Sequence, residues 1–132
     1  MFSEAIPSQI EMVEPVVSRA LRVMAEHGCV DGQSTAAELS LREALANAIL
    51  HGNKSESKKR VQLDCYQESD GTLLLVVQDE GHGFDLDAVR DPTSPENLTR
   101  STGRGIYLIK HFMDEVEYRN RGRELRMRKK KQ

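Results

Sequence analysis

The strands that this sequence predicts come in pairs joined by short turns, and this pairing restricts the fold more than any other feature. The segment Arg60 to Glu68 alternates apolar and polar residues, imperfectly, as a half-buried strand does. A turn signal at residues 69–71 leads into Thr72 to Asp79, whose continuous apolar run is typical of a buried strand. Together these segments predict an antiparallel hairpin.

A second pair of strand patterns lies near the C-terminus. Residues 114–120 alternate in polarity, Arg121 and Gly122 mark a turn, and residues 124–131 alternate again. Because the strands occur in hairpins rather than in βαβ units, the sequence favours an α+β two-layer sandwich, in which one sheet packs against helices.

Three segments predict helices. Ser8 to His27 places apolar residues at helical spacing after a short segment that resembles a strand remnant, and Pro15 either kinks this helix or marks a later start. The segment Ser34 to Asn53 begins with cap-type residues and ends at a glycine and an asparagine. A final helix opens at Gly105 and contains IYLIKHFM.

The size and composition predict one soluble domain that spans residues 1–132, because 38% of the residues are hydrophobic and 30% are charged. The apolar stretch Leu73 to Val77 is far shorter than the roughly 20 residues of a membrane-spanning helix. The first residues show no secretory signal, so we expect a cytoplasmic protein without a membrane partner. Cys29 and Cys65 lack metal-site spacing and are interpreted as reduced thiols.

Basic residues gather in the segment RNRGRELRMRKKKQ, although the formal net charge of the chain is −2. Such a segment is compatible with nucleic acid or with an acidic partner. A solvated strand that ends in a basic tail is the simpler interpretation. We do not expect nucleic-acid binding from one tail alone.

The first candidate site segment lies on the second predicted helix. Glu43 and Asn47 are four residues apart, so they lie within roughly 40° of each other on one helix face, which His51 continues. A carboxylate accepts a proton from an attacking hydroxyl, and an amide oxygen is a hard ligand suited to magnesium. Such a pair alone is more typical of a solvated helix face.

The second candidate segment follows the apolar strand, where QDEGHGF delivers the carboxylate of Asp79 just before two glycines. An acceptor carboxylate in an apolar cleft binds an exocyclic amine such as that of adenine. Gly81 and Gly83 permit positive φ and let a flat ligand approach closely. A glycine-rich hairpin turn is the alternative interpretation.

The third candidate segment comes after a possible short helix at Leu86 to Arg90 and within an expected mobile loop, DPTSPENLTRSTGRG. Hydroxyls and glycines directly before a helix offer free backbone N–H groups to phosphate. An arginine just before them and another among them add charge-assisted contacts to the same phosphates. The residues concerned are Arg100, Ser101, Thr102, Gly103, Arg104, Gly105 and Ile106.

The three segments together predict one ligand that combines magnesium, a base such as adenine, and phosphates. Magnesium is expected at Asn47, the base at Asp79, and the phosphates at Gly103 and Gly105. The fixed order of the segments is more specific than any one of them.

This order of motifs resembles the Bergerat-fold ATPase superfamily of DNA gyrase and sensor histidine kinases. The segments REALANAILHGN and STGRGIYLIKHFMDEVEY look like the anti-sigma factor serine/threonine kinases in particular, and the likeness runs from about Ser8 to the C-terminus. The resemblance implies a mixed, mostly antiparallel sheet with its helices on one face. It also implies that Asp91 to Thr102 forms an ATP lid.

The resemblance assigns roles to individual residues. It makes Glu43 the general base, Asn47 the magnesium ligand and Asp79 the adenine-binding aspartate. The matching glycines of the two glycine motifs are Gly81, Gly83, Gly103 and Gly105. The chain departs from the family pattern at Ala46, where some members carry a hydroxyl, and at Arg104, where an apolar residue is frequent.

The resemblance also implies partners. Members of that family phosphorylate a serine on a small anti-sigma factor antagonist and sequester a sigma factor, often as homodimers, and here the N-terminal strand looks short for a dimer. One alternative is an ATP-binding regulatory module that grips its partner without phosphoryl transfer. Another is the catalytic domain of a sensor histidine kinase, which requires a dimerisation helix with a phosphoacceptor histidine. We expect no room for that helix in this chain.

Overall fold

One five-stranded sheet and three α-helices make up the part of the chain that the structure, a computed structural model, describes, namely residues 1–81 and 101–131. The strands are β1 (Phe2–Pro7), β2 (Arg60–Gln67), β3 (Leu73–Gln78), β4 (Glu115–Arg119) and β5 (Glu124–Lys129). The helices are α1 (Val13–Glu26), α2 (Asp31–Asn47) and α4 (Ser101–Phe112), with short helical turns η1 (Ile10–Met12), η2 (Ala48–Gly52) and η4 (Asn120–Gly122).

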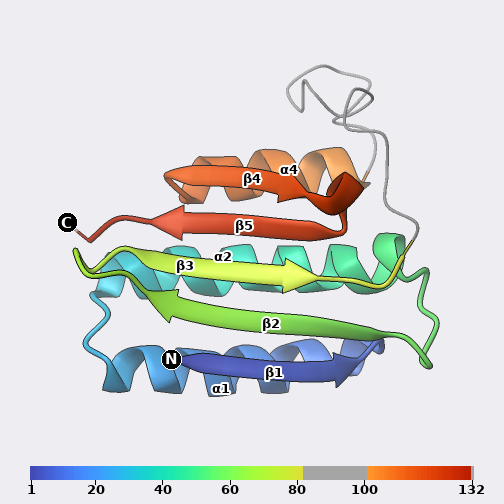
Figure 1. The fold of residues 1–132 in the computed structure, drawn as a ribbon, viewed down its shortest axis with the longest axis horizontal. Coiled ribbons are helices and arrows are strands. Elements are labelled where there is room, and N and C mark those ends of the chain that lie inside the picture. The colour runs from blue at the N-terminus through green and yellow to red at the C-terminus, as the bar shows by residue number, and fades with distance from the viewer. Residues whose placement is uncertain (82–100, 132) are drawn as a thin grey trace.

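The fold has two layers, with α1, α2 and α4 on one face of the sheet (Figure 1). The strand order is β1-β2-β3-β5-β4, and each neighbouring pair is antiparallel. This arrangement confirms the predicted α+β sandwich and both predicted hairpins. Within the described residues every neighbouring pair of strands is antiparallel, whereas the resemblance implied a mixed, mostly antiparallel sheet.

The central position of strand β3 in the sheet explains why its sequence is almost entirely apolar. Alternate residues of β3 face the helices, and Leu73, Leu75 and Val77 belong to the core shared by the two layers. Two of its residues on the other face, Leu74 and Val76, are also buried. Leu74 pairs with Arg128 and Val76 with Arg126 on β5, where arginine stems can cover apolar neighbours.

The first helix begins later than the sequence pattern predicted. Residues 2–7 form a full strand, not a remnant, and the α-helix starts only at Val13. Pro15 is therefore the third residue of α1, where its missing N–H costs nothing because the first turn has no internal acceptor. Of the two outcomes expected for Pro15, the structure shows the later start.

Helix α2 begins at Asp31, three residues before the predicted start at Ser34, and its first turn is fixed to the sheet by Gln33. The buried Gln33 carboxamide donates to the carbonyls of Gly71 (2.9 Å) and Lys129 (3.0 Å) and accepts the N–H of Val30 (3.3 Å). One side chain therefore joins the helix start to the β2–β3 turn and to β5.

Helix α2 passes directly into η2, which is a π-helical turn. The N–H of Asn53 donates to the carbonyl of Ala48 (2.8 Å), five residues back. The expectation that His51 continues the face of Glu43 and Asn47 assumed α-helical spacing, which ends at Asn47. His51 is exposed in this turn.

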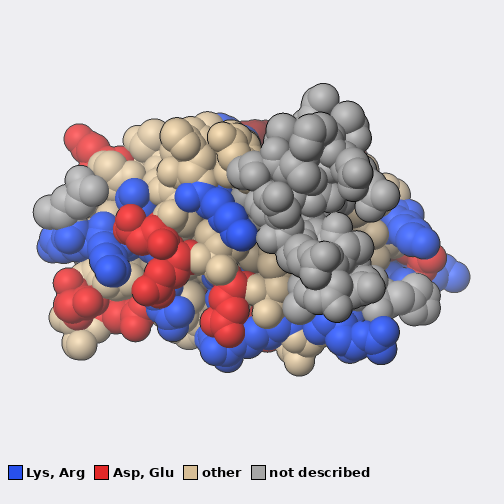
Figure 2. Space-filling view, turned by 90° about the horizontal axis from the view of Figure 1, so that it is seen from above, with Lys and Arg blue, Asp and Glu red and all other residues tan. Residues whose placement is uncertain are grey.

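The sheet face away from the helices carries charges of both signs. Arg128 contacts Glu68 (2.9 Å) and Glu115 (3.7 Å), and Arg119 contacts Glu117 (2.9 Å). Figure 2, seen from the β4 and α4 edge, shows basic and acidic side chains side by side. The basic segment noted in the sequence thus includes strand β5, whose arginines Arg126 and Arg128 are in ion pairs.

Two sequence expectations concern the cysteines and the membrane. Both thiols are free, and burial of Cys65 in the core raises its pKa to about 12. Among residues 1–81 and 101–131, no helix is both long and apolar enough to cross a bilayer.

We predict that Gln33→Ala lowers the free energy of unfolding by about 1–3 kcal/mol, because it removes the partner of partly buried backbone groups of Gly71, Lys129 and Val30. Urea unfolding measures the change. Thr35→Ala, two residues along the same helix at an exposed position, is the matched control and should change stability by less than about 0.5 kcal/mol. Equal stability of the two variants would contradict the prediction.

Candidate functional site

Glu43 and Asn47 converge on the same point of helix α4. A Cβ atom placed on Gly105 would lie 2.8 Å from Glu43 Oε1 and 3.1 Å from Glu43 Cγ, and it would overlap Asn47 Nδ2. Real Cβ atoms do not approach other atoms so closely, so only glycine lets α4 lie directly against both side chains. The predicted shared face of Glu43 and Asn47 is therefore present, and the third candidate segment meets it.

The polar groups of Glu43 and Asn47 lie in contact with α4. Both residues are partly buried. Within residues 1–81 and 101–131, neither side chain hydrogen-bonds to another group. A partly buried carboxylate and carboxamide without internal partners are suited to a ligand or a metal ion.

Asp79 lies at the end of β3 and is held at its backbone and at its carboxylate. Its N–H donates to the carbonyl of Arg123 (2.9 Å), and the N–H of Gly81 donates to its Oδ1 (2.8 Å). Burial raises the pKa of Asp79, while the Gly81 N–H and the charges of Arg123 and Lys59 oppose that rise. Asp79 acts in turn on Tyr118, whose pKa is raised first by burial and then by the Asp79 charge.

Gly81 is required here for a reason other than the one the sequence predicted. Its φ is not positive, unlike that of Gly28, Gly71 and Gly122. A Cβ on Gly81 would overlap the carbonyl oxygen of Gly52 and lie 2.7 Å from its carbon. The second candidate segment therefore needs glycine for a close approach of two backbones.

The turn η2 connects the first two candidate segments. It begins one residue after Asn47 and ends at Gly52, which packs directly on the Asp79 carboxylate. Asp79 and Asn47 are thus separated by a single π-helical turn. The structure brings together Glu43, Asn47, Asp79, Gly81 and Gly105.

Asn53 also builds the site, although the sequence indicated it only as a helix terminator. It is fully buried, donates from its amide to the carbonyl of Arg60 (3.0 Å) and accepts the N–H of Glu80 (2.8 Å). These bonds fix the end of η2 to the start of β2 and to the residue after Asp79. An asparagine after a helical pattern was the available signal, but it did not reveal these tertiary partners.

The third segment differs from its prediction in one respect. Helix α4 begins at Ser101, so Ser101 to Gly105 lie within its first turns rather than directly before it. The first four N–H groups of a helix still lack internal acceptors and favour anions. Gly83, Arg100, the predicted helix at 86–90 and lid residues 91–100 lie outside the described residues, as do the side chains of residues 101–104 and 106.

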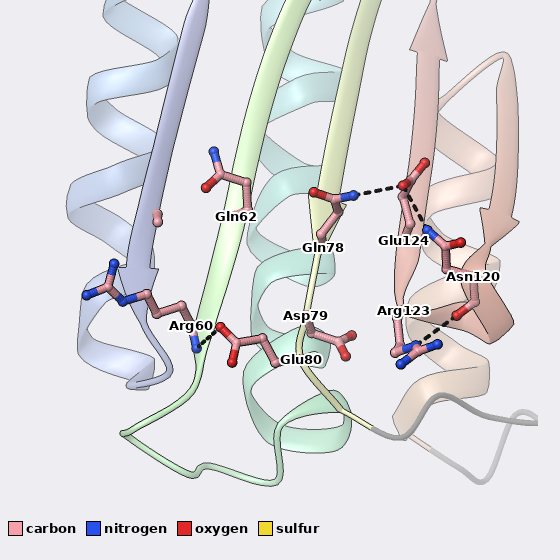
Figure 3. Close-up of a pocket in the computed structure, with 9 residues that line it drawn as sticks. Arg60, Gln62, Gln78, Asp79, Glu80, Asn120, Arg123 and Glu124 are labelled. Atoms are coloured by element: carbon pink, nitrogen blue, oxygen red, sulfur yellow. Dashed lines mark hydrogen bonds between the residues drawn. The ribbon is translucent and has the colours of Figure 1, made fainter.

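A cavity of about 570 Å³ lies beside Asp79 on the other side of the sheet (Figure 3). Ala5, Gln62, Gln78 and Glu124 line it and share one row of the strand register, on the face away from the helices. Glu43 and Asn47 do not line this cavity. Asp79 is the one proposed site residue that lines it, so the cavity adjoins the Asp79 end of the candidate site and not the cluster at Gly105.

Comparison with known proteins places these features in a family. The family model described as the histidine kinase-like ATPase domain matches residues 6–129. The chain is 40% identical over 78 residues to the anti-sigma F factor of Oceanobacillus iheyensis, and the matched stretch covers 57% of this chain and 52% of that protein. It is 39% identical over 77 residues to the anti-sigma F factor of Priestia megaterium, with 56% of this chain and 52% of that protein covered.

A further relative is similar over a longer stretch. The chain is 27% identical over 117 residues to the serine-protein kinase RsbW of Staphylococcus epidermidis, with 84% of this chain and 74% of that protein covered. The chain spans about half the length of the anti-sigma F factors that it matches. Since the family model covers far more than half of the sequence and the sheet carries its helices on one face, the chain belongs to the histidine kinase-like ATPase domain family.

Proposed function

We propose that this protein binds ATP with magnesium and transfers the γ-phosphoryl group to a serine of a partner protein. The observation that carries the proposal is the convergence of Glu43 and Asn47 on Gly105, one π-helical turn away from Asp79. In this proposal Glu43 is the proton acceptor, Asn47 the metal ligand and Asp79 the carboxylate that binds adenine. The first two lie close to the start of α4. Membership of the ATPase family supports ATP as the nucleotide.

In this proposal Asp79 accepts a hydrogen bond from the exocyclic amine of adenine. The Gly81 N–H occupies its Oδ1, which leaves Oδ2 as the acceptor for the base. A fixed carboxylate discriminates between bases, because a base without a donor leaves a partly buried charge unpaired.

Asn47 supplies the protein ligand for magnesium. Magnesium usually takes one or two protein oxygens and completes its shell with phosphate and water. The Asn47 carboxamide, which has no hydrogen-bond partner among the described residues, fits that requirement. When bound, the ion neutralises charge that develops on the phosphates. The N-terminal N–H groups of α4, at Ser101 to Arg104, face the same phosphates in this proposal.

Glu43 accepts the proton of the attacking serine hydroxyl. It lies one helical turn before Asn47 and contacts the same part of α4, so it can reach the end of a triphosphate held at these positions. Phosphoryl transfer depends mainly on positioning and on charge neutralisation. The chain therefore has to hold Glu43, Asn47 and α4 in a fixed geometry.

The proposed partners are a small anti-sigma factor antagonist that carries the acceptor serine and a sigma factor that this protein regulates by partner switching. The names of the relatives, anti-sigma F factor and serine-protein kinase, support these partner classes. A cytoplasmic location, a homodimeric state and a single domain over residues 1–132 complete the proposal.

A second candidate function is an ATP-binding anti-sigma module without phosphoryl transfer. The names of the 40% and 39% identical relatives favour it, because they specify an anti-sigma factor and no kinase. The two functions differ at Glu43, which only phosphoryl transfer requires.

We predict that Glu43→Gln slows phosphorylation of a candidate antagonist by about 100-fold or more, because the variant cannot accept the serine proton, while ATP still binds. Transfer of label from ATP to the antagonist measures the rate, and nucleotide titration measures binding. Glu38→Gln on the same helix, where the carboxylate pairs with Arg42, is the control and should leave the rate unchanged. A normal rate in Glu43→Gln would refute the base role and favour the binding module.

We predict that Asn47→Ala removes the magnesium-dependent part of ATP affinity, because the variant lacks the protein oxygen for the ion. Titration with ATP in magnesium and in EDTA measures that part in each protein. Asn47→Asp keeps an oxygen ligand and should retain the magnesium dependence. If Asn47→Ala responds to magnesium as the natural protein does, the metal ligand lies elsewhere.

We predict that ionisation of Asp79 opposes folding. The unfolded carboxyl ionises near its ordinary pKa of about 3.9, whereas burial keeps the proton on the folded carboxyl to higher pH. The folded state binds more protons between these two pKa values, so stability falls as pH rises through that window. Urea unfolding at a series of pH values should show this fall in the natural protein relative to Asp79→Asn. A difference between the two proteins that does not change with pH would contradict the prediction.

A further inference from the structure

We infer that Gly52 is a positioning residue for nucleotide recognition, because the absence of a side chain there leaves room for the Asp79 carboxylate in its base-binding position. The inference rests on the proposed function. It concerns a residue at the end of η2 that itself touches neither the base nor the phosphates in that proposal.

The contact between Gly52 and Asp79 is very close. A Cβ atom on Gly52 would lie 2.5 Å from Asp79 Cγ and 3.0 Å from Oδ1, and it would overlap Oδ2. The backbone at Gly52 does not itself demand glycine, because its φ is not positive and the residue belongs to a helical turn. Helix propensity alone would favour alanine at such a position.

The backbone around Gly52 cannot easily move away from Asp79. The Asn53 and Ser55 N–H groups close the turn onto the carbonyls of Ala48 (2.8 Å) and Ile49 (2.7 Å). The buried Asn53 side chain fixes the end of the turn to β2 and to Glu80. On the other side, the Gly52 carbonyl is in close contact with Gly81.

The Asp79 backbone is fixed as well, through its N–H bond to the carbonyl of Arg123. A methyl group at position 52 therefore displaces the Asp79 carboxylate, which is held by a single hydrogen bond and can rotate about its side-chain bonds, rather than either backbone. Its rotation breaks the 2.8 Å bond from the Gly81 N–H and moves Oδ2 away from the position proposed for the adenine amine. Asn47 contacts α4 at Gly105 rather than at Gly52, so the magnesium contribution should not change.

A double-mutant cycle of thermal stability tests the contact without any nucleotide. Gly52→Ala should lower Tm by about 5 °C in the natural background, because of the clash. It should change Tm little, or raise it, when Asp79→Ala has removed the carboxylate. Gly32→Ala is the control, since a Cβ there meets nothing within 4 Å. An equal loss of Tm in both backgrounds would overturn the inference.

Nucleotide selectivity tests the positioning role. ATP and GTP are titrated against the natural protein and Gly52→Ala, each with and without magnesium. In Gly52→Ala the ratio of the Kd for GTP to the Kd for ATP should fall about tenfold, while the response to magnesium stays the same. A retained preference overturns the role of Gly52 alone. A natural protein that binds ATP and GTP equally overturns the proposed function and, with it, this role.

Discussion

Helix α2 is held to the sheet at both ends by a buried carboxamide, and the site depends on this attachment. Gln33 joins the helix start to the β2–β3 turn and to β5, and Asn53 joins the following turn to β2 and to the end of β3. Between these two points, apolar residues such as Leu41 and Leu45 pack into the core. Helix α2 therefore cannot slide along the sheet without leaving buried polar groups unpaired, which costs far more than a lost surface contact. The positions of Glu43 and Asn47 relative to Asp79 follow from this constraint.

The π-helical turn η2 adds a second constraint to the same helix. An α-helix that continued past Asn47 would place Gly52 and Asn53 at a different angle to the sheet. The wider turn brings Gly52 onto Asp79 and aims Asn53 at the backbone of Glu80. Such turns occur mostly as single insertions within α-helices, and they are frequent at functional sites. In this protein the turn converts one helix into a support for both proposed halves of the nucleotide site.

Patterns local in sequence predicted most of the fold. Hairpin turns and strand alternation predicted β2 to β5, and helical spacing predicted α1, α2 and α4, because both signals arise from neighbouring residues. The errors arose where distant residues decide the outcome. The partners of Gln33 lie 38 and 96 residues away along the chain, and the need for glycine at 81 comes from the backbone of Gly52 rather than from φ. The shared face of Glu43 and Asn47 was predictable from spacing, whereas its contact with Gly105 was not.

The choice between a kinase and a passive ATP-binding module depends on the electrostatics of Glu43. In the proposed function Asn47, Asp79 and the start of α4 supply a metal ligand, a base acceptor and phosphate donors, and these suffice for binding. A partly buried carboxylate beside the same part of α4 brings a negative charge close to a negatively charged triphosphate, which weakens binding. That charge is useful only if it accepts a proton during a reaction. The position of Glu43, directly against Gly105 and beside Asn47, is therefore our reason for proposing phosphoryl transfer rather than binding alone, a distinction that the fold by itself does not make.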